Sequence, residues 1–368
     1  LPSNTDPISR SLSSVIFSAS PARLDPLSAC ARNLPRDAAV SAVSEPEKNA
    51  DRNNSAAIAP DVSQNAVSRF SVVMSIALVF LGSHILWGRA RLRSRETALL
   101  GHMEIRDLGE IYGDVLFFGG YYSNLQATTA LLKCAADKGI GAQNMIFTGD
   151  AVAYCADGPT VIDLLVASQC YIVAGNVEKQ LGQRKDNCNC GFAAGAACDV
   201  LSAGWYAHAD RTITDVQRDW MVGLADVLVF THTGKRYVVL HGGFSDVSRF
   251  MWPSWGDAEF VEEINLITAQ LGPIDGVICG HSGLAFERVI DGVSWINAGA
   301  VGMPPHDGRS QTRYCILGDQ GARFERLEYD VVGAVRAMEL AGLTQGYDKT
   351  LTTGIWPSED VLPAQLRR

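Results

Sequence analysis

The sequence predicts a folded domain of the α/β class, with layered β-sheets flanked by helices, behind an N-terminal tail and one transmembrane helix. Two observations support this fold class. From residue 114 onward, short apolar runs alternate with segments of helical periodicity. After residue 280, four apolar runs follow one another without helices between them, which indicates antiparallel strands. The combination favours a layered sheet sandwich over a Rossmann domain.

The N-terminal tail comprises residues 1–69, which are rich in Ser, Ala, Asn and Pro and show no sustained apolar periodicity. Such a composition predicts disorder. The first 36 residues contain eight Ser and four Arg against two Asp. This part of the tail is compatible with an organellar targeting sequence and equally with a solvated extension.

The apolar segment at 70–88, FSVVMSIALVFLGSHILWG, contains no Asp, Glu, Lys or Arg. As a helix it would span roughly 28 Å, close to the ~30 Å hydrocarbon core of a membrane. One Arg precedes it and four follow within 89–95, so the positive-inside rule places the large domain on the cytosolic, stromal or matrix side. We therefore expect a single transmembrane anchor, followed by a basic linker and lead-in at 89–113. A signal-type apolar region or a buried helix is the alternative.

The folded domain is expected at 114–330, and a C-terminal segment at 331–368 is expected to pack over it. Helical periodicity predicts helices at 124–138, 161–167 and 331–341. Apolar runs predict strands at 114–120, 144–148, 170–174, 236–240, 275–279, 286–290, 294–298, 314–317 and 323–329.

Composition limits the classes of partner. The chain of 368 residues is 47% hydrophobic, enough for one large core, and carries a formal net charge of −9. Residues 1–99 have more Lys and Arg than Asp and Glu, so the whole acidic excess lies in residues 100–368. An acidic folded domain argues against nucleic acid as a partner.

Four polar residues, each beside a glycine, directly follow apolar runs: Asp150, Asn176, His241 and His281. The carboxyl ends of strands are where open α/β sheets place their sites. One carboxylate, one amide oxygen and two imidazoles form a donor set suited to Zn, Mn or Fe. The sequence therefore predicts a divalent metal centre.

The order and content of these motifs resemble the calcineurin-like metallophosphoesterase superfamily, over about residues 114–330. The matching segments are FGGYYSNLQA, FTGDAVAYCADGP, AGNVEKQL, VVLHGGFSD, ICGHSG and INAGAVGMP. The resemblance implies a β-sandwich flanked by helices, with two metals at the strand ends and a small phosphorylated substrate. It also implies that Asp150 bridges the two metals, and that Asn176, His241 and His281 complete the ligands of the second metal.

The chain departs from the family pattern at the first metal. Where the family has Asp-x-His-Gly-Asn, this chain begins with Gly120 and carries Tyr122 in place of the histidine. Where the family has Gly-His-x-His, the second histidine is Gly283, and the histidine of Gly-Asn-His is Val177. Gly, Val and Tyr do not supply the missing donors in ordinary sites. We therefore expect one divalent metal rather than a binuclear centre.

Two residues near these motifs are candidate catalytic groups. Glu178 is suited to act as a general acid, or alternatively as a negative charge at a helix N-terminus. Tyr122 is suited to donate a hydrogen bond to a phosphate, although packing is the usual role of an aromatic residue after a strand.

The turn between the first predicted strand and helix is a candidate phosphate-binding loop, because backbone amides at such a turn can bind an anion. An ordinary turn and helix cap is the alternative interpretation. The residues concerned are Gly119, Gly120, Ser123 and Asn124.

A cysteine cluster at Cys188, Cys190 and Cys198 follows the Asn176 motif. Three close thiols are suited to bind a second, soft metal or to act as a redox group, while the alternative is that they are reduced and packed. Nothing in the nine cysteines predicts a disulfide scaffold on a reducing side of a membrane.

The favoured function is that of a membrane-tethered, metal-dependent phosphoester hydrolase with a mononuclear site. The first alternative is a catalytically inactive protein of the same fold that binds a metal or a phosphorylated ligand. The second is a thiol-based metal or redox module.

Overall fold

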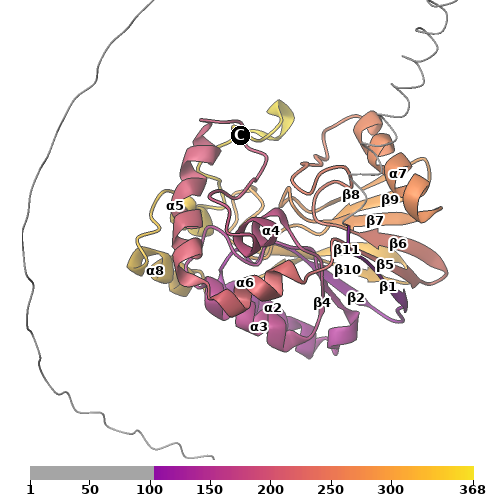
Figure 1. Cartoon of the computed structure of the whole chain (residues 1–368), viewed down its shortest axis with the longest axis horizontal. Coiled ribbons are helices and arrows are strands. Elements are labelled where there is room, and N and C mark those ends of the chain that lie inside the picture. The colour runs from indigo at the N-terminus through magenta and orange to yellow at the C-terminus, as the bar shows by residue number, and fades with distance from the viewer. Residues whose placement is uncertain (1–102) are drawn as a thin grey trace, which may run out of the picture. The chain divides into compact units, whose positions relative to one another are not determined.

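The computed structural model describes residues 103–368, which form two β-sheets packed face to face with helices outside both (Figure 1). The predicted tail and the apolar segment at 70–88 lie outside the described residues. Among residues 103–368, no helix has the length and apolar character needed to cross a membrane.

The larger sheet has six strands in the order β1-β5-β6-β7-β9-β8. Neighbours β1 and β5, β6 and β7, and β7 and β9 are parallel, whereas β5 and β6, and β8 and β9, are antiparallel. The strands are β1 (Ile105–Glu110), β5 (Val227–His232), β6 (Lys235–Val239), β7 (Gly276–Cys279), β8 (Phe286–Ile290) and β9 (Val293–Asn297).

The smaller sheet has five strands in the order β11-β10-β2-β3-β4. Strands β2, β3 and β4 run parallel to one another, and β10 is antiparallel to both β2 and β11. The strands are β2 (Val115–Phe118), β3 (Met145–Phe147), β4 (Tyr171–Ile172), β10 (Thr312–Gly318) and β11 (Gly321–Leu327).

Helices cover both outer faces. Helix α7 (Asp257–Leu271) lies over the larger sheet, and the others lie on the side of the smaller sheet (Figure 1). These others are α2 (Leu125–Asp137), α3 (Gly158–Ser168), α4 (Asn176–Gly182), α5 (Ala197–Thr212), α6 (Asp215–Val222), α8 (Val331–Leu340) and α9 (Tyr347–Thr353), with 3₁₀ turns η1 (Ala142–Asn144) and η2 (Ala364–Leu366).

Three apolar clusters hold these layers together. The central one joins the inner faces of the two sheets, where the rings of Phe117 and Phe230 lie 5.8 Å apart. A second packs the smaller sheet against its helices through residues such as Leu131 and Val161, and a third packs α7 through Phe260. Burial on both faces explains why the runs of the inner strands β2, β3 and β7 are continuously apolar rather than alternating.

The layered α/β architecture expected from the sequence is confirmed, and the expected strands all appear, within a few residues of their expected ends. Three details differ. Antiparallel strands are not confined to the part of the chain after residue 280, because β5 and β6 are also antiparallel. Strand β5 itself was not among the expected strands. Strand β1 pairs with β5 from within the segment assigned to the lead-in, so the folded region starts before residue 114.

Candidate metal site and adjoining pocket

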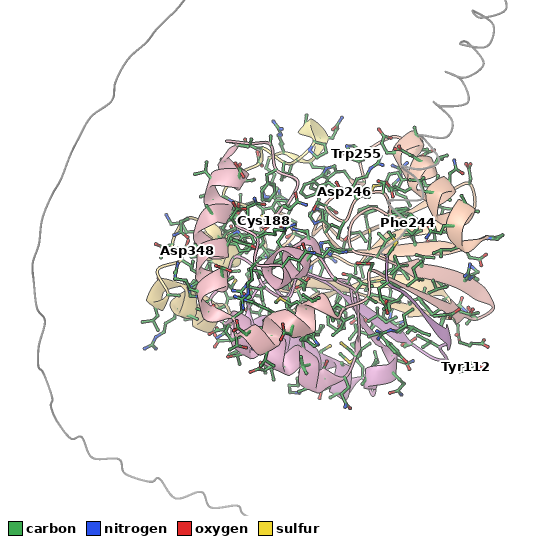
Figure 2. The ribbon with its side chains drawn as sticks, viewed as in Figure 1. Tyr112, Cys188, Phe244, Asp246, Trp255 and Asp348 are labelled. Carbon is green, nitrogen blue, oxygen red and sulfur yellow. A yellow bond between two sulfur atoms is a disulfide. The ribbon has the colours of Figure 1, made fainter. Side chains whose placement is uncertain are left out.

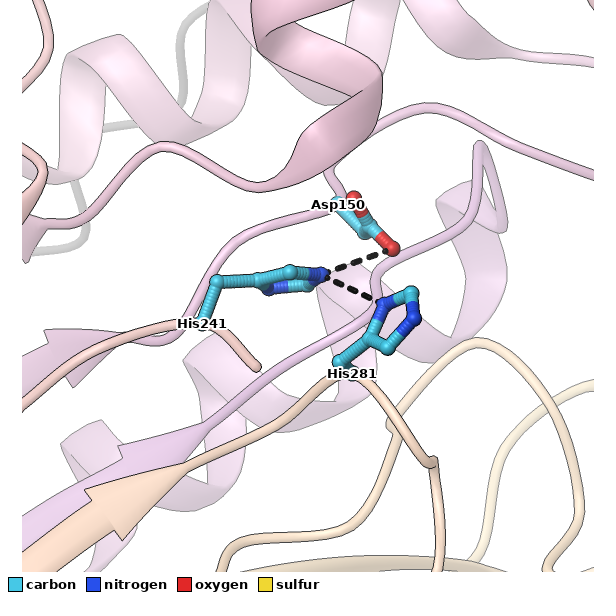
Figure 3. Close-up of side chains that lie close together, drawn as sticks. All are labelled: Asp150, His241 and His281. Carbon is cyan, nitrogen blue, oxygen red and sulfur yellow. Dashed lines mark hydrogen bonds and ion pairs between the residues drawn. The ribbon is translucent and has the colours of Figure 1, made fainter. Parts of the chain in front are cut away.

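The structure brings together the four polar residues that follow the strands. Asp150 follows β3, Asn176 begins α4 just after β4, His241 follows β6 and His281 follows β7. All four are buried. Figure 3 shows Asp150 and His281 at the same end of the His241 ring, both joined to one ring nitrogen. Strands from both sheets therefore contribute to one site.

The Nε2 atom of His241 lies at the centre of the group. It is 3.0 Å from His281 Nδ1, 3.1 Å from Asn176 Oδ1 and 3.3 Å from Asp150 Oδ2. One ligand atom from each of Asp150, His241 and His281 lies within 4.8 Å of the other two. These separations are short enough for a single ion to contact every member of the group.

Neighbouring hydrogen bonds determine which atoms face the site. His241 Nδ1 donates to the carbonyl of Thr148 at 2.6 Å, so Nε2 of the neutral ring carries a lone pair. Asn176 Nδ2 donates to the carbonyl of Cys188 at 2.8 Å, which turns Oδ1 toward the site. With this tautomer, His241 Nε2 and the oxygen atoms of Asn176 and Asp150 are acceptors that face one another. A cation would satisfy these three acceptors, so the residues present fit a divalent metal.

The electrostatics of the site also suit a cation. Burial would raise the pKa of Asp150, but His241, His281 and the Val177 amide lower it overall. Burial and the neighbouring His241 lower the pKa of His281 to about 3. Burial opposes protonation of His241, yet the Asp150 carboxylate raises its pKa. At neutral pH Asp150 is ionised and His281 is neutral, which are the states that metal ligands require.

Two glycines of the motifs are required by close packing within the site. A Cβ atom at Gly149 would lie 2.5 Å from His241 Nδ1, and the residue has a φ of +100°. A Cβ atom at Gly175 would lie 2.3 Å from Asp150 Oδ1. Both distances are far inside van der Waals contact, so any side chain there would displace a metal-facing residue.

The structure places the Glu178 carboxylate among backbone amides of the site, which suits a positioning role. Its carboxylate is fully buried and accepts hydrogen bonds from the backbone amides of Asp150 at 2.8 Å, Ala151 at 2.7 Å and Gly175 at 2.8 Å. Asp150 has a φ of +64°, a conformation that non-glycine residues rarely adopt. Glu178 ties this turn to the start of α4 and so orients Asp150.

The expected phosphate-binding loop is an internally bonded turn. The amides of Gly120, Tyr122 and Ser123 donate to carbonyls of Gly149, Asp150 and Ala151. The Asn124 side chain caps α2 through the Ala127 amide. A Cβ atom at Gly119 would lie 2.2 Å from Thr148 Oγ1, so Gly119 serves close packing. These amides are already paired, which corrects the expectation that Gly119, Gly120, Ser123 and Asn124 bind phosphate.

The ring of Tyr122 lies beside Gly120 and Gly283, the two glycines that stand where the family pattern has metal ligands. A Cβ atom at Gly120 would lie 2.5 Å from Tyr122 Cζ, and one at Gly283 would lie 3.8 Å from the Tyr122 hydroxyl oxygen. The three positions that lack first-metal ligands therefore meet around one aromatic ring. Burial, followed by Asp150 and Glu178, raises the pKa of Tyr122, which keeps its hydroxyl neutral.

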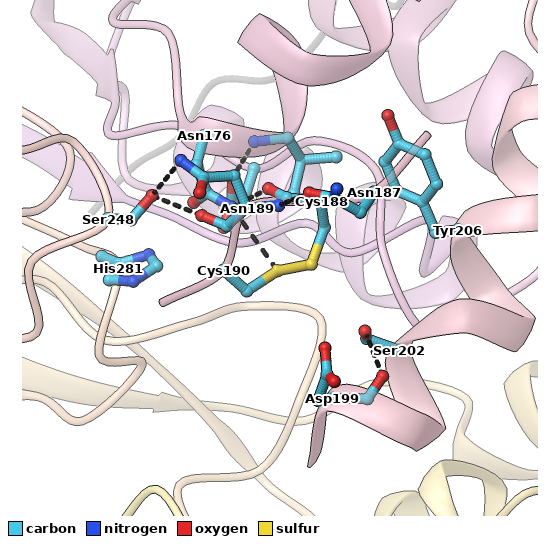
Figure 4. Close-up of a disulfide and its surroundings, with 12 residues drawn as sticks. Asn176, Asn187, Cys188, Asn189, Cys190, Asp199, Ser202, Tyr206, Ser248 and His281 are labelled. Carbon is cyan, nitrogen blue, oxygen red and sulfur yellow. Dashed lines mark hydrogen bonds between the residues drawn. A yellow bond between two sulfur atoms is a disulfide. The ribbon is translucent and has the colours of Figure 1, made fainter. Parts of the chain in front are cut away.

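Cys188 and Cys190 form a disulfide, and Cys198 is a buried free thiol. The bond was not expected from the sequence, and in this form the three sulfur atoms do not make a thiolate metal site. Cys188 lies in the loop between α4 and α5 (Figure 2). The disulfide lies beside Asn176 and His281 (Figure 4). The pair therefore belongs to the surroundings of the Asp150 site.

A small pocket that is partly open to solvent adjoins the site. Asp150, His281, Tyr122 and Gly283 are among the residues that line it. Eight of the lining residues are aromatic, and their rings come from distant segments of the chain. The aromatic residues are Tyr122, Tyr154, Phe192, Trp205, Phe250, Trp252, Tyr347 and Trp356.

The C-terminal segment supplies part of this wall. The Trp356 indole donates to the carbonyl of Pro304 at 2.8 Å, and its backbone amide donates to His306 Nδ1 at 2.9 Å. His306 is in turn paired with Glu359 at 2.7 Å. Residues beyond α9 thus hold an aromatic ring at the pocket, as the expected cover segment suggested.

Comparison with known proteins gives a structural likeness only. No family model matches the sequence, and no curated protein sequence matches it. A hypothetical protein from Pyrococcus horikoshii OT3 is similar in structure, at 13% identity and a TM-score of 0.56, over 66% of this chain and 99% of that one. A metallophosphoesterase from Sphaerobacter thermophilus is similar at 17% identity and a TM-score of 0.50, with the same coverage of each chain.

Proposed function

We propose, since the chain has the calcineurin-like metallophosphoesterase fold, that it is a metal-dependent phosphoester hydrolase with a mononuclear site. One observation carries this proposal. His241 Nε2, His281 Nδ1, Asn176 Oδ1 and an Asp150 carboxylate oxygen face one another at the strand ends.

These four residues would hold one divalent ion, of which Zn, Mn and Fe suit the donor set. Such an ion supplies a Lewis acid that polarises a phosphoryl oxygen and favours attack by water. The protein contributes orientation. Thr148 fixes the tautomer of His241, Cys188 orients Asn176, and Glu178 fixes the backbone of Asp150.

The pocket provides the place for a small phosphorylated substrate. It opens directly onto Asp150 and His281, so a phosphoryl group beside the ion would leave its substituent among the aromatic residues. The Tyr122 ring lies between Gly120 and Gly283, at positions where the family pattern has first-metal ligands, which supports a single-ion site.

Turnover by the full chain tests this proposal. Phosphomonoesters and phosphodiesters are screened with Mn²⁺, with Zn²⁺ and with a chelator. We expect metal-dependent hydrolysis that falls at least about 100-fold in His241→Ala, which loses a ligand. His208→Ala is the matched control, because His208 lies on α5 and bonds the carbonyl of Ala156. Full activity in His241→Ala would contradict the proposal.

A second candidate is a protein that binds a phosphorylated ligand without hydrolysing it. The missing first-metal ligands at Gly120, Tyr122 and Gly283 favour this candidate, because one ion cannot stabilise both the attacking and the leaving oxygen as two ions do. Metal-dependent ligand binding without turnover of any ester in the screen would select it.

We also propose that residues 70–88 tether the folded region to a membrane, with the large domain on the cytosolic, stromal or matrix side. The support is the length of the apolar segment and the Arg residues that follow it. Residues 1–69 would then be a tail on the other side of that membrane.

A further inference from the structure

The loop at 183–196, between α4 and α5, contacts the metal site through its disulfide (Figure 4). It contains no helix or strand, and its two buried residues are Cys188 and Cys190, which are bonded to each other. The side-chain amide of Asn176 donates to the carbonyl of Cys188 at 2.8 Å and lies 3.5 Å from Cys190 Sγ. One metal-facing residue is therefore held by both halves of the disulfide.

A second contact joins this loop to the segment that follows β6. The Ser248 hydroxyl donates to the carbonyl of Asn189, which lies between the two cysteines, and accepts from Asn189 Nδ2 at 3.3 Å. A Cβ atom at Gly191 would lie 2.8 Å from the Ser248 carbonyl oxygen. The same segment carries Phe250, whose ring lies 4.4 Å from that of His281. The loop is thus also packed on the segment that supports a second metal-facing residue.

The disulfide is poorly suited to be a structural cross-link. It joins residues two apart in one loop, so it closes a very short segment and connects no two helices or strands. The stabilisation that a disulfide gives by restricting the unfolded chain grows with the length of the closed segment, and is small here. Cys190 also lines the pocket that is partly open to solvent, so an external thiol has a route to it. Accessible disulfides of this kind are the ones that are reduced and formed again.

Reduction would change the loop at the points that support the metal site. Two thiol sulfur atoms cannot stay at bonding distance, and both cysteine side chains are packed in the apolar cluster of the smaller sheet and its helices. The backbone at 188–190 must therefore move. The carbonyl of Cys188 moves with it, so Asn176 loses the partner that turns its Oδ1 toward the site.

We propose that Cys188 and Cys190 form a reversible thiol–disulfide exchange site, and that reduction of this pair weakens metal binding through Asn176. The exchange site goes beyond the proposed function, whereas the effect on metal binding rests on the proposed metal site. By linkage, an ion that binds the oxidised chain more tightly also shifts the pair toward the disulfide by the same factor.

The co-substrate of the exchange is a dithiol. One of its thiolates attacks a sulfur atom of the protein disulfide and forms a mixed disulfide, and the other cysteine leaves as a thiolate that takes up a proton. The second thiol of the co-substrate then displaces the bound cysteine. The dithiol is oxidised to a cyclic disulfide, and the protein pair gains two electrons and two protons.

Equilibration with dithiothreitol tests both parts. The full chain is incubated with mixtures of reduced and oxidised dithiothreitol, with Mn²⁺ or with a chelator. Free thiols are trapped with N-ethylmaleimide, and mass spectrometry gives the reduced fraction of the peptide that contains Cys188 and Cys190. Mn²⁺ is chosen over Zn²⁺ because thiolates bind Zn²⁺ and would favour the reduced form. We expect reversible reduction in the folded chain, and a shift toward the disulfide of at least about fivefold with Mn²⁺.

The possible failures are distinguishable. A pair that stays oxidised, or stays reduced, across all mixtures would overturn the exchange site. The same reduction equilibrium with and without Mn²⁺, in a chain that binds Mn²⁺, would overturn the effect on metal binding. Absence of Mn²⁺ from both the oxidised and the reduced chain would be a failure of the proposed metal site, and the effect on metal binding would fail with it.

A pair of variants assigns the response to these cysteines. The double variant Cys188→Ser, Cys190→Ser should bind Mn²⁺ as weakly as the reduced chain does, with the same affinity in the presence and absence of dithiothreitol. Cys134→Ser is the control, because it removes a free thiol on α2 and keeps the disulfide. Its affinity for Mn²⁺ should fall at least about fivefold on reduction, as in the unaltered chain. An equal fall in the double variant would show that dithiothreitol acts elsewhere and would overturn the proposal.

Discussion

The smallest unit of this site is the contact between Glu178 and three backbone amides. A buried carboxylate that accepts from the amides of Asp150, Ala151 and Gly175 joins two strand ends that are distant in sequence. Burial, together with Asp150, raises the pKa of Glu178, and the amide donors partly oppose that shift. The residue thus stabilises the turn in which Asp150 has a positive φ.

Glu178→Gln should destabilise the folded chain by about 1–3 kcal/mol, because the amide group has one acceptor oxygen in place of two and brings a donor against backbone N–H groups. Urea unfolding of the metal-free full chain measures this. Glu339→Gln, on the exposed face of α8, is the control and should change the stability little. If the two variants have the same free energy of unfolding, Glu178 does not have the positioning role.

At the scale of elements, the start of α4 must approach the turn after β3 closely. Gly175 is the N-cap of α4, with φ −82° and ψ 176°, so its backbone conformation is open to any residue. A side chain at position 175 is excluded by the close contact with Asp150 and not by the backbone conformation of Gly175.

Gly175→Ala should therefore lower metal affinity by at least about tenfold, since its Cβ would displace Asp150. Gly256→Ala is a closely matched control. Gly256 is the N-cap of α7, with φ −66° and ψ 175°, and its added Cβ would meet Glu259 at 3.4 Å. Competition with a metal-binding dye gives both affinities. The same affinity in the two variants would show that close approach at Gly175 is unimportant.

The loop after α4 supports Asn176 through the carbonyl of Cys188 and carries the disulfide. Cys190→Ser removes the disulfide and should lower metal affinity by about tenfold, because Asn176 loses part of its orientation. Cys134→Ser, a free and partly buried thiol on α2, is the control. In the same dye competition, we expect a lower metal affinity in Cys190→Ser than in Cys134→Ser. Equal metal affinities would show that the loop does not support the metal site.

The strands and the four metal-facing residues were predictable because they depend on short segments. Runs such as Asp275–Cys279 are apolar on both faces, and a polar residue after each run falls at a strand end. Strands β1 and β5, which pair with each other across more than 100 residues, were both missed. The residues of β1 are mostly exposed, whereas β5 was missed although it is a buried apolar run. The pocket was missed because Phe192 and Trp356 meet only in the folded chain.

For the whole molecule, the proposal of a membrane tether predicts how the chain fractionates. The full chain, expressed in cells, should remain with membranes after alkaline carbonate extraction, because the apolar segment at 70–88 matches a bilayer in length. A deletion of 70–88 should move the protein to the supernatant. If carbonate extracts the intact chain from membranes, the proposal of a membrane tether is contradicted. The proposal of a metal site does not depend on this result.

Metal content per chain tests the central claim most directly. The purified full chain, after incubation with excess Mn²⁺ or Zn²⁺ and removal of free ion, is analysed by elemental mass spectrometry beside His241→Ala and His208→Ala. One site facing the Tyr122 ring predicts about one ion per chain, retained in His208→Ala and lost in His241→Ala. No ion in the unaltered chain, two ions per chain, or an ion retained in His241→Ala would contradict a mononuclear centre built on Asp150, Asn176, His241 and His281.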